Sequence, residues 1–166
     1  MKLKKWFCFA VALLLLAGLL PQPEAQAYAA QTALLTFSDS GVTETEQGTG
    51  YSVSGTVLTV TAPGTYRITG QCAEGSIVVG KQLSGVTLIL DDLTLSASVT
   101  APLVVKKESS VLLMLEGEST LTDNEDASTE ETNEDFEGAC VKVKNGASLT
   151  VFGDGTLRLL GNAKTA

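Results

Sequence analysis

The stretches that decide the fold are "SIVVGKQLSGVTLILDDLTL" (76–95) and "PLVVKKESSVLLMLEGESTL" (102–121), because the second repeats the pattern of the first. A third segment, "CVKVKNGASLTVFGDGTL" (140–157), shows the same order of short apolar runs. Each run has the length of a strand, and several alternate apolar and polar residues, which places one face against a core. The segments therefore predict β-strands that recur in successive structural units.

The repeat can be aligned by position. Equivalent units start at Ile77, Leu103 and Val141, with spacings of 26 and 38 residues. In each unit the second apolar run begins eight or nine residues after the first. Further along, the segment 115–121 aligns with 151–157 without a gap, so that Gly and Thr-Leu recur at matching positions. This agreement predicts that whole units stack on one another.

A repeat of this length, with two or three strands per unit and no long helical periodicity, predicts an all-β parallel β-helix, or β-solenoid. An antiparallel β-sandwich is the alternative, because it also has strands every 8–12 residues. A sandwich, however, does not predict similarity in register between units. The last segment, "TLRLLGNAKTA" (156–166), stops where the next strand is due. We therefore expect a short solenoid that is truncated at its C-terminus.

The N-terminus predicts export. Residues 1–27 combine the basic "MKLKK", an apolar run at 6–20 and small residues at Ala25 and Ala27, in the order of a secretory signal peptide. An uncleaved membrane anchor is the alternative. We expect a secreted or cell-surface protein that has no membrane contact after cleavage. Residues 28–75 are then an N-terminal cap with the first strands, and 76–166 form the β-helix coils.

Charge and composition exclude several classes of function. The chain of 166 residues has a formal charge of −8, and removal of residues 1–27 takes away three lysines and one glutamate, which leaves −10. Such a charge disfavours nucleic acid and anionic membranes as partners. The absence of histidine from the sequence excludes Ser-His-Asp and Cys-His catalysis. Export would permit a disulfide between Cys72 and Cys140, and two small buried side chains are the alternative.

The repeat is interrupted by the acidic stretch "TDNEDASTEETNEDFEGA" (122–139), which holds eight carboxylates and no basic residue. The pattern resumes after it, so we place a loop insertion at 123–137. Insertions into solenoids map to loops on one face, often the binding face. Oxygen ligands on both arms of the loop fit calcium, whereas like charges without a cation favour a mobile flap. The candidate metal ligands are Asp123, Asp126, Glu134 and Asp135.

Four motifs also carry a family resemblance: "VTAPGTYRITG" (60–70), "VTLILDDLTL" (86–95), "LTD" (121–123) and "ASLTVFGDGTL" (147–157). In this order they resemble a family of secreted bacterial carbohydrate-binding domain-containing proteins, over roughly 34–162. The resemblance implies a right-handed parallel β-helix with a fold similar to that of pectate lyases. It also implies calcium binding and an association with cellulose and acidic plant polysaccharides.

The candidate ligand-binding residues are Lys106, Lys144 and Phe136. The two lysines occupy equivalent positions in successive units, so they are expected to stack on one face, and Phe136 ends the acidic loop as an aromatic side chain that could contact a sugar. A polysaccharide lyase needs a base and a cation, but a solvated lysine row that pairs with acids fits the pattern better. We predict a noncatalytic module that binds polysaccharide, cellulose or pectin-like, with the help of calcium. A lyase-like enzyme and a structural or adhesive surface repeat are the alternatives.

Overall fold

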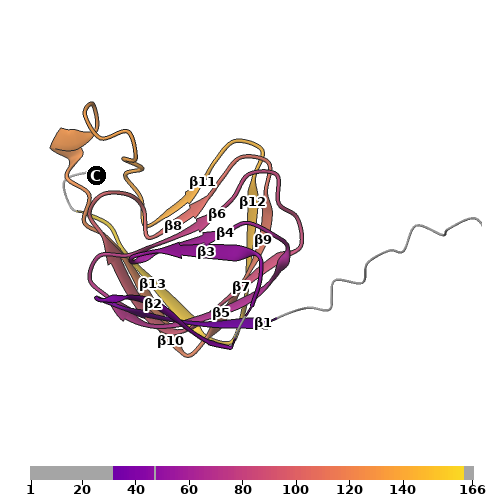
Figure 1. Ribbon diagram of the computed structural model, residues 1–166. Coiled ribbons are helices and arrows are strands. Elements are labelled where there is room, and N and C mark those ends of the chain that lie inside the picture. Colours follow the sequence, from indigo (N-terminus) through magenta and orange to yellow (C-terminus); the bar gives the residue numbers. More distant parts are fainter. Residues whose placement is uncertain (1–31, 47, 163–166) are drawn as a thin grey trace, which may run out of the picture.

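The computed structural model describes residues 32–46 and 48–162, which form β-strands and one short 3₁₀ helix, η1 (Ala127–Thr129) (Figure 1). The predicted signal peptide at 1–27 lies outside these residues. Nowhere in the described ranges is there a helix long and apolar enough to cross a membrane. In this part of the chain the architecture is all-β.

The strands form two sheets. The first sheet contains, in spatial order, β12 (Ser148–Gly153), β9 (Ser110–Glu116), β7 (Val86–Ala97), β5 (Gly64–Cys72), β1 (Thr32–Ser38) and β2 (Gly41–Glu46); β10 (Glu118–Asp123) pairs with both β7 and β13 (Thr156–Leu160). The second sheet contains β11 (Val141–Val143), β8 (Leu103–Val105), β6 (Ser76–Val79), β4 (Val57–Val60) and β3 (Tyr51–Ser54).

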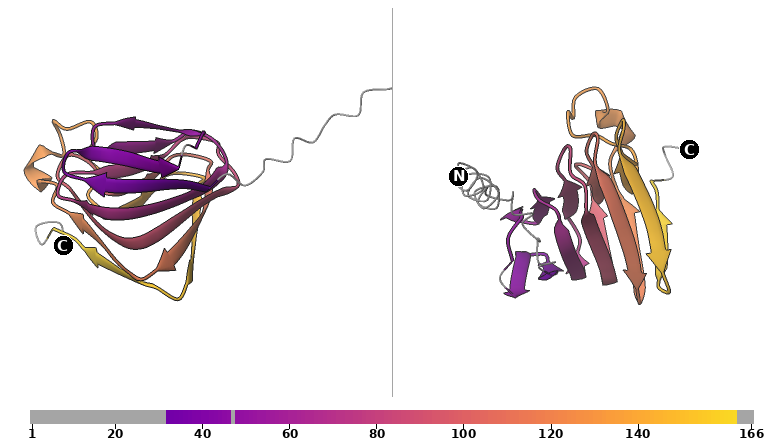
Figure 2. Two further views of the ribbon diagram at one scale, coloured as in Figure 1. Left: turned by 60° about the horizontal axis from the view of Figure 1, so that its bottom comes forward. Right: turned by 90° about the vertical axis from the view of Figure 1, so that its right-hand side faces the viewer.

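From β4 to β9 the chain alternates between the two sheets, and each strand pairs in parallel with its equivalent in the next unit. Ile77 pairs with Leu103, and Leu103 with Val141, as the repeat predicts. In Figure 1 the strands line three sides of the molecule, and in the right-hand view of Figure 2 they stack in chain order. The mixed character of the sheets comes from two antiparallel pairs near the N-terminus, β1–β2 and β3–β4.

One part of the predicted alignment is wrong by two residues. Val151 pairs with Leu113, not with Leu115, and Thr156 pairs with Glu118, not with Thr120. The 38-residue offset of Leu103 and Val141 is therefore kept through the whole unit. A slip of two residues leaves every side chain on the same face of its strand, because side chains alternate with a period of two. The apolar pattern alone cannot detect such a slip.

The core consists of inward-facing side chains that stack in columns from unit to unit. Tyr66, Leu88 and Leu113 occupy one column and are at most 1% exposed, whereas Val151, at the next position, is 51% exposed. The two ends of the stack therefore differ. At the N-terminal end the edge strands are the antiparallel β2 and β3, and at the other end β11, β12 and β13 each pair on one side only among the described residues.

The two cysteines belong to this core. Cys72 and Cys140 are both free and buried. They pack among the apolar side chains of the columns, so the structure agrees with the alternative of two small buried residues. Burial raises the pKa of the Cys72 thiol, which keeps this side chain protonated and unreactive.

An ion-pair network braces one outer corner of the stack. The Nη1 atom of Arg67 lies 2.7 Å from Asp91 Oδ2 and 2.6 Å from Glu116 Oε2, and Nη2 lies 3.0 Å from Glu116 Oε1. At the same corner Asp92 has a left-handed φ of 49° and accepts the Glu118 N–H at 2.8 Å. The aspartates at 91 and 92 thus act as corner residues.

This network predicts a pH-dependent stability. The hydrogen bonds from Arg67 hold the pKa of Glu116 below its usual value of 4.5. A lowered pKa in the folded state stabilises the fold above pH 4.5, and this contribution is lost as the pH falls through the folded value. Arg67→Met should therefore lower the urea midpoint at pH 7 and have a smaller effect at pH 3. Arg158→Met serves as the control, and an equal loss at both pH values for Arg67→Met would contradict the prediction.

Candidate functional site

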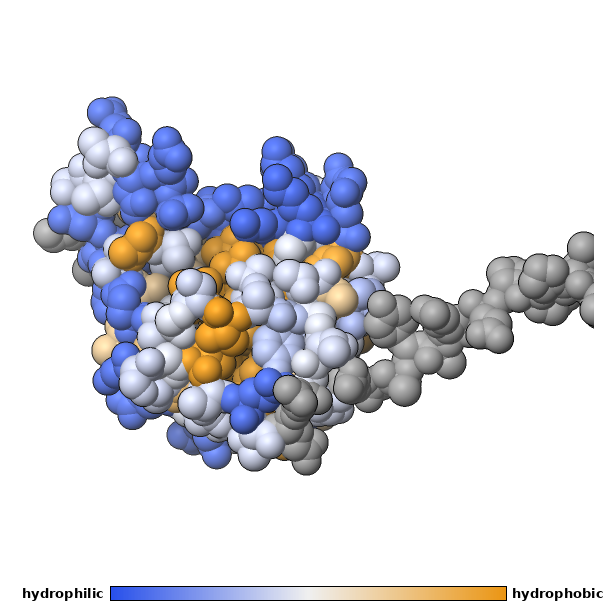
Figure 3. Space-filling view, in the orientation of Figure 1, coloured by the Kyte–Doolittle hydropathy of each residue, from blue (hydrophilic) through white to orange (hydrophobic). Residues whose placement is uncertain are grey.

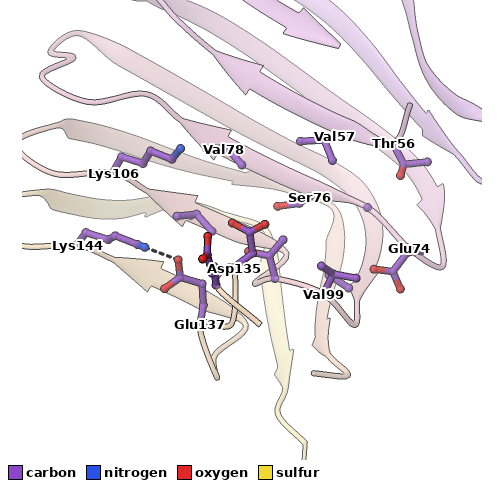
Figure 4. Close-up of a pocket in the computed structure, with 15 residues that line it drawn as sticks. Thr56, Val57, Glu74, Ser76, Val78, Val99, Lys106, Asp135, Glu137 and Lys144 are labelled. Atoms are coloured by element: carbon purple, nitrogen blue, oxygen red, sulfur yellow. Dashed lines mark ion pairs between the residues drawn. The ribbon is translucent and has the colours of Figure 1, made fainter. Parts of the chain in front are cut away.

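In the structure the predicted insertion at 123–137 lies in the connection between β10 and β11, and from here on the acidic loop means this whole connection, residues 124–140. A pocket of about 420 Å³ lies between the outer face of the second sheet and the acidic loop. Its size falls within the usual range for small-molecule sites. Figure 3 shows hydrophilic side chains gathered on the projecting loop, and Figure 4 shows the pocket side chains. The lining residues are Thr56, Val57, Glu74, Gly75, Ser76, Val78, Ala97, Val99, Thr100, Val104, Lys106, Glu134, Asp135, Glu137 and Lys144.

Valine side chains give the pocket its apolar surface. Val78 and Val104 pair in neighbouring strands, β6 and β8, and alternate with the core residues of those strands, so both point away from the core. Val104 is nevertheless only 3% exposed. Val57 from β4 and Val99, which follows β7, extend this surface. The pocket therefore offers C–H groups between its charged side chains.

The two predicted lysines lie on one wall of the pocket. The backbone N–H groups of Lys106 and Lys144 donate to Val79 and Val105, respectively, at 3.0 and 2.9 Å, which places them at equivalent points of successive units. Both side chains extend in the same direction (Figure 4). Lys144 forms an ion pair with Glu137, whereas no ion pair to Lys106 is found in the part of the chain that the structure describes. Lys106 is therefore available to a ligand.

Carboxylates occupy the other walls. Glu134 and Asp135 are exposed on the acidic loop, and Glu137 next to them has a side chain only 10% exposed. Glu74 lies across the pocket, where its carboxylate accepts the Ser98 N–H at 2.9 Å and the Ser98 hydroxyl at 2.7 Å. The lining has four carboxylates against two lysines, so its formal charge is negative.

The acidic loop is tied to the stack by hydrogen bonds. The Asn133 amide donates to the Val99 carbonyl at 2.7 Å, and the Lys142 ammonium donates to the Glu137 carbonyl at 3.2 Å. Within the loop, Asp126 caps η1 by accepting the Ser128 N–H at 3.0 Å. These contacts orient the loop over the sheet so that its returning arm lines the pocket.

The four predicted calcium ligands do not come together. Glu134 and Asp135 line the pocket, but Asp126 caps η1, and Asp123 is 2% exposed and accepts the Glu125 N–H. Within the described ranges, no group of three or more His, Cys, Asp or Glu side chains is placed to hold a metal. The residues present thus do not fit a calcium site formed by the protein alone. Calcium stays a prediction.

The third predicted ligand-binding residue, Phe136, is half-buried and is not among the lining residues. The sequence reasoning missed Glu74 and the valines at 57, 78 and 104. The valines belong to apolar strand runs that resemble core, and Glu74 is a single acidic residue outside the acidic stretch. The aligned positions of Val78 and Val104 could have indicated a shared face. It also missed Glu125, which is 1% exposed and is hidden in sequence among seven other carboxylates.

Three comparisons with known proteins gave matches. A family model described as "Carbohydrate-binding domain-containing protein" matches residues 54–166. A protein of the same description from Acetivibrio thermocellus is 30% identical over 117 residues, which is 68% of this chain and 40% of the relative. A solved structure, a polysaccharide lyase-like protein from C. thermocellum as a gadolinium derivative, has a TM-score of 0.62 at 26% identity, over 76% of this chain and 51% of that one. The chain thus spans about half, or less, of the length of these relatives.

Proposed function

Because this chain belongs to the carbohydrate-binding domain-containing family, we propose that it is an exported, noncatalytic module that binds polysaccharide in the pocket beside the acidic loop. The observation that carries the proposal is the lining of this pocket, where an apolar valine surface lies between lysines and carboxylates. Sugars present both C–H groups and hydroxyls, and hydroxyls can donate to carboxylates and accept from ammonium groups. The signal-peptide pattern at 1–27 supports export.

We also propose that the strands form a right-handed parallel β-helix. The parallel pairing of successive units and the alternation of the chain between two sheets support this architecture. A crossover between parallel strands of one sheet is right-handed in almost all proteins. In such a helix the acidic loop is a lateral extension of one coil, so it can shape a binding surface without interrupting the stack.

The charge of the pocket favours a neutral polysaccharide. Four carboxylates against two lysines would repel a uronate polymer, and the whole chain carries a further excess of negative charge. A neutral glucan such as cellulose avoids this repulsion. Because no aromatic side chain among residues 32–46 and 48–162 lines the pocket, affinity would come from charged hydrogen bonds and valine contacts.

Retention on insoluble polysaccharides tests the proposal. We expect the protein to be retained on cellulose in a pull-down, and retention on calcium-free pectate to be weaker. Bovine serum albumin serves as the control for non-specific retention. Failure to bind cellulose, pectate and peptidoglycan alike would contradict the binding proposal and favour a structural or adhesive surface repeat.

Calcium is proposed as an aid to the binding of acidic polysaccharide. Glu134 and Asp135 provide fewer than the six to eight oxygen ligands that calcium takes, so water and the uronate would have to supply the others. Retention on pectate should therefore require millimolar calcium and fall with chelator, while retention on cellulose should not change. Glu134→Gln/Asp135→Asn should remove the calcium effect. Retention on pectate that does not change when chelator is added would contradict this role.

A lyase-like activity is the second candidate, because the similar solved structure is called polysaccharide lyase-like. Lys106, which has no ion pair in the described part of the chain, is the side chain that would have to act as the base. A lysine base needs a lowered pKa, through burial or a neighbouring cation. Lys106 is half-exposed among carboxylates, so we expect no unsaturated uronides from pectate with calcium. Ultraviolet absorbance measures them, and their release would contradict the noncatalytic proposal.

A further inference from the structure

Glu125 joins the two arms of the acidic loop at its base. Its Oε1 atom accepts the Glu137 N–H at 2.8 Å, and its Oε2 atom accepts the Gly138 N–H at 2.7 Å. The partners lie 12 and 13 residues further along the chain. One carboxylate therefore closes the whole excursion between β10 and β11.

This carboxylate is buried without a cation beside it. Glu125 is 1% exposed, and within the described ranges it takes part in no ion pair. A charge removed from water is strongly unfavourable unless hydrogen bonds compensate it. The two backbone N–H groups provide that compensation, and hydrogen bonds to an ionised acceptor are stronger than neutral ones. Such a pair fixes the position of the returning arm.

The backbone of Glu125 is held in place as well. Its N–H donates to Asp123 Oδ1 at 2.9 Å, at the end of β10, and its carbonyl accepts the Asn162 amide at 2.6 Å. The neighbouring Asn124 N–H donates to the Ala97 carbonyl at 2.8 Å. The carboxylate thus projects from a part of the chain that is anchored to the sheet.

The position of Glu137 links this contact to the pocket. Its backbone N–H is bound by Glu125, while its side chain pairs with Lys144 and has one carboxylate oxygen 3.8 Å from the Lys142 ammonium. Glu134 and Asp135 precede it on the same arm and line the pocket. Gly138 then turns with a φ of +60°, a left-handed conformation that side chains rarely adopt.

We propose that Glu125 is a positioning residue of the pocket: it holds the returning arm of the acidic loop so that Glu134, Asp135 and Glu137 face the lysines. The role in ligand binding rests on the proposed function, whereas the role in holding the loop does not. Glu125 does not touch the ligand. Its loss acts through the arm that it positions.

Hydrogen exchange of single amides, followed by NMR, tests this role. In the wild type the amides of Glu137 and Gly138 should exchange at least about tenfold more slowly than those at the exposed loop tip. Glu125→Gln retains the shape of the side chain but only one acceptor oxygen, so at least one of the two amides should lose about tenfold protection. In Glu125→Ala both amides should lose this protection. Core amides such as that of Leu113 should remain protected in every variant.

The affinity for cello-oligosaccharide is the second measurement that tests this role. Glu125→Gln should weaken binding about tenfold, and Glu131→Gln, which removes the same charge from an exposed site on the loop, should change neither exchange nor affinity. Unprotected amides in the wild type, or wild-type exchange in Glu125→Ala, would overturn the inference. Loss of amide protection in a Glu125 variant that still binds cello-oligosaccharide with wild-type affinity would also overturn the inference. If the wild type binds no polysaccharide, the proposed function fails, and the exchange data alone decide whether Glu125 holds the loop.

Discussion

Leu88→Ala is expected to lower the free energy of unfolding by about 3 kcal/mol. Leu88 is fully buried between Tyr66 and Leu113 in one column of the core, and those neighbours are 1% and 0% exposed. Rigid strands on both sides prevent the column from closing around a smaller side chain. The substitution therefore loses contact with both neighbours and leaves a cavity.

Val151→Ala is the matched control, because Val151 occupies the next position of the same column but is 51% exposed. Removal of a half-exposed side chain should cost less than about 1 kcal/mol. Urea unfolding followed by circular dichroism measures both values. Equal losses for the two variants would contradict the difference in burial between Leu88 and Val151 within this column.

The second large effect concerns binding. Lys106→Gln/Lys144→Gln should weaken the affinity for cello-oligosaccharide about 100-fold, because each lost hydrogen bond from a charged group is worth about 1.5 kcal/mol or more. Lys144 has a second role as the ion-pair partner of Glu137. The double variant thus removes two donors and one support of the acidic loop. Isothermal titration calorimetry gives the affinities.

Lys107→Gln separates the effect of the pocket from that of net charge. Lys107 directly follows Lys106 but is exposed and does not line the pocket. Its substitution should change the affinity less than twofold. Melting curves of the lysine variants should show the same unfolding transition as the wild type, because the lysines lie outside the core. A double variant that binds as well as the wild type would show that the ligand contacts another surface.

Much of the fold is predictable because it depends on a repeated apolar pattern. The starts at Ile77, Leu103 and Val141 are found from spacing, since each must place its side chain inward at the same point of a unit. The alignment beyond Leu115 is wrong by two residues because the pattern has a period of two. Backbone contacts decide there: Gly153 lies over Leu115 so closely that a Cβ atom would stand 2.4 Å from the Leu115 carbonyl oxygen.

The candidate site is predictable only in part. Lys106 and Lys144 share a wall because equivalent residues of a repeat stack, so their positions follow from the alignment. The wall formed by Glu134, Asp135 and Glu137 depends on where the acidic loop folds back, and neither composition nor spacing specifies that direction. The roles of Asp123 and Glu125 depend on burial, which reverses the expectation that acidic loop residues face solvent or a metal. A dense run of carboxylates gives no sign of which one is structural.

The most direct test of the central claim is an NMR titration of the ¹⁵N-labelled protein with soluble cello-oligosaccharide. We predict that amide signals of pocket residues, such as Val78, Val104, Lys106 and Asp135, shift in a saturable manner. Signals from Thr120 and Arg158, which pair in β10 and β13 and do not line the pocket, should stay in place. Shifts confined to another face, or no saturable shift anywhere, would contradict the proposal that this pocket binds carbohydrate.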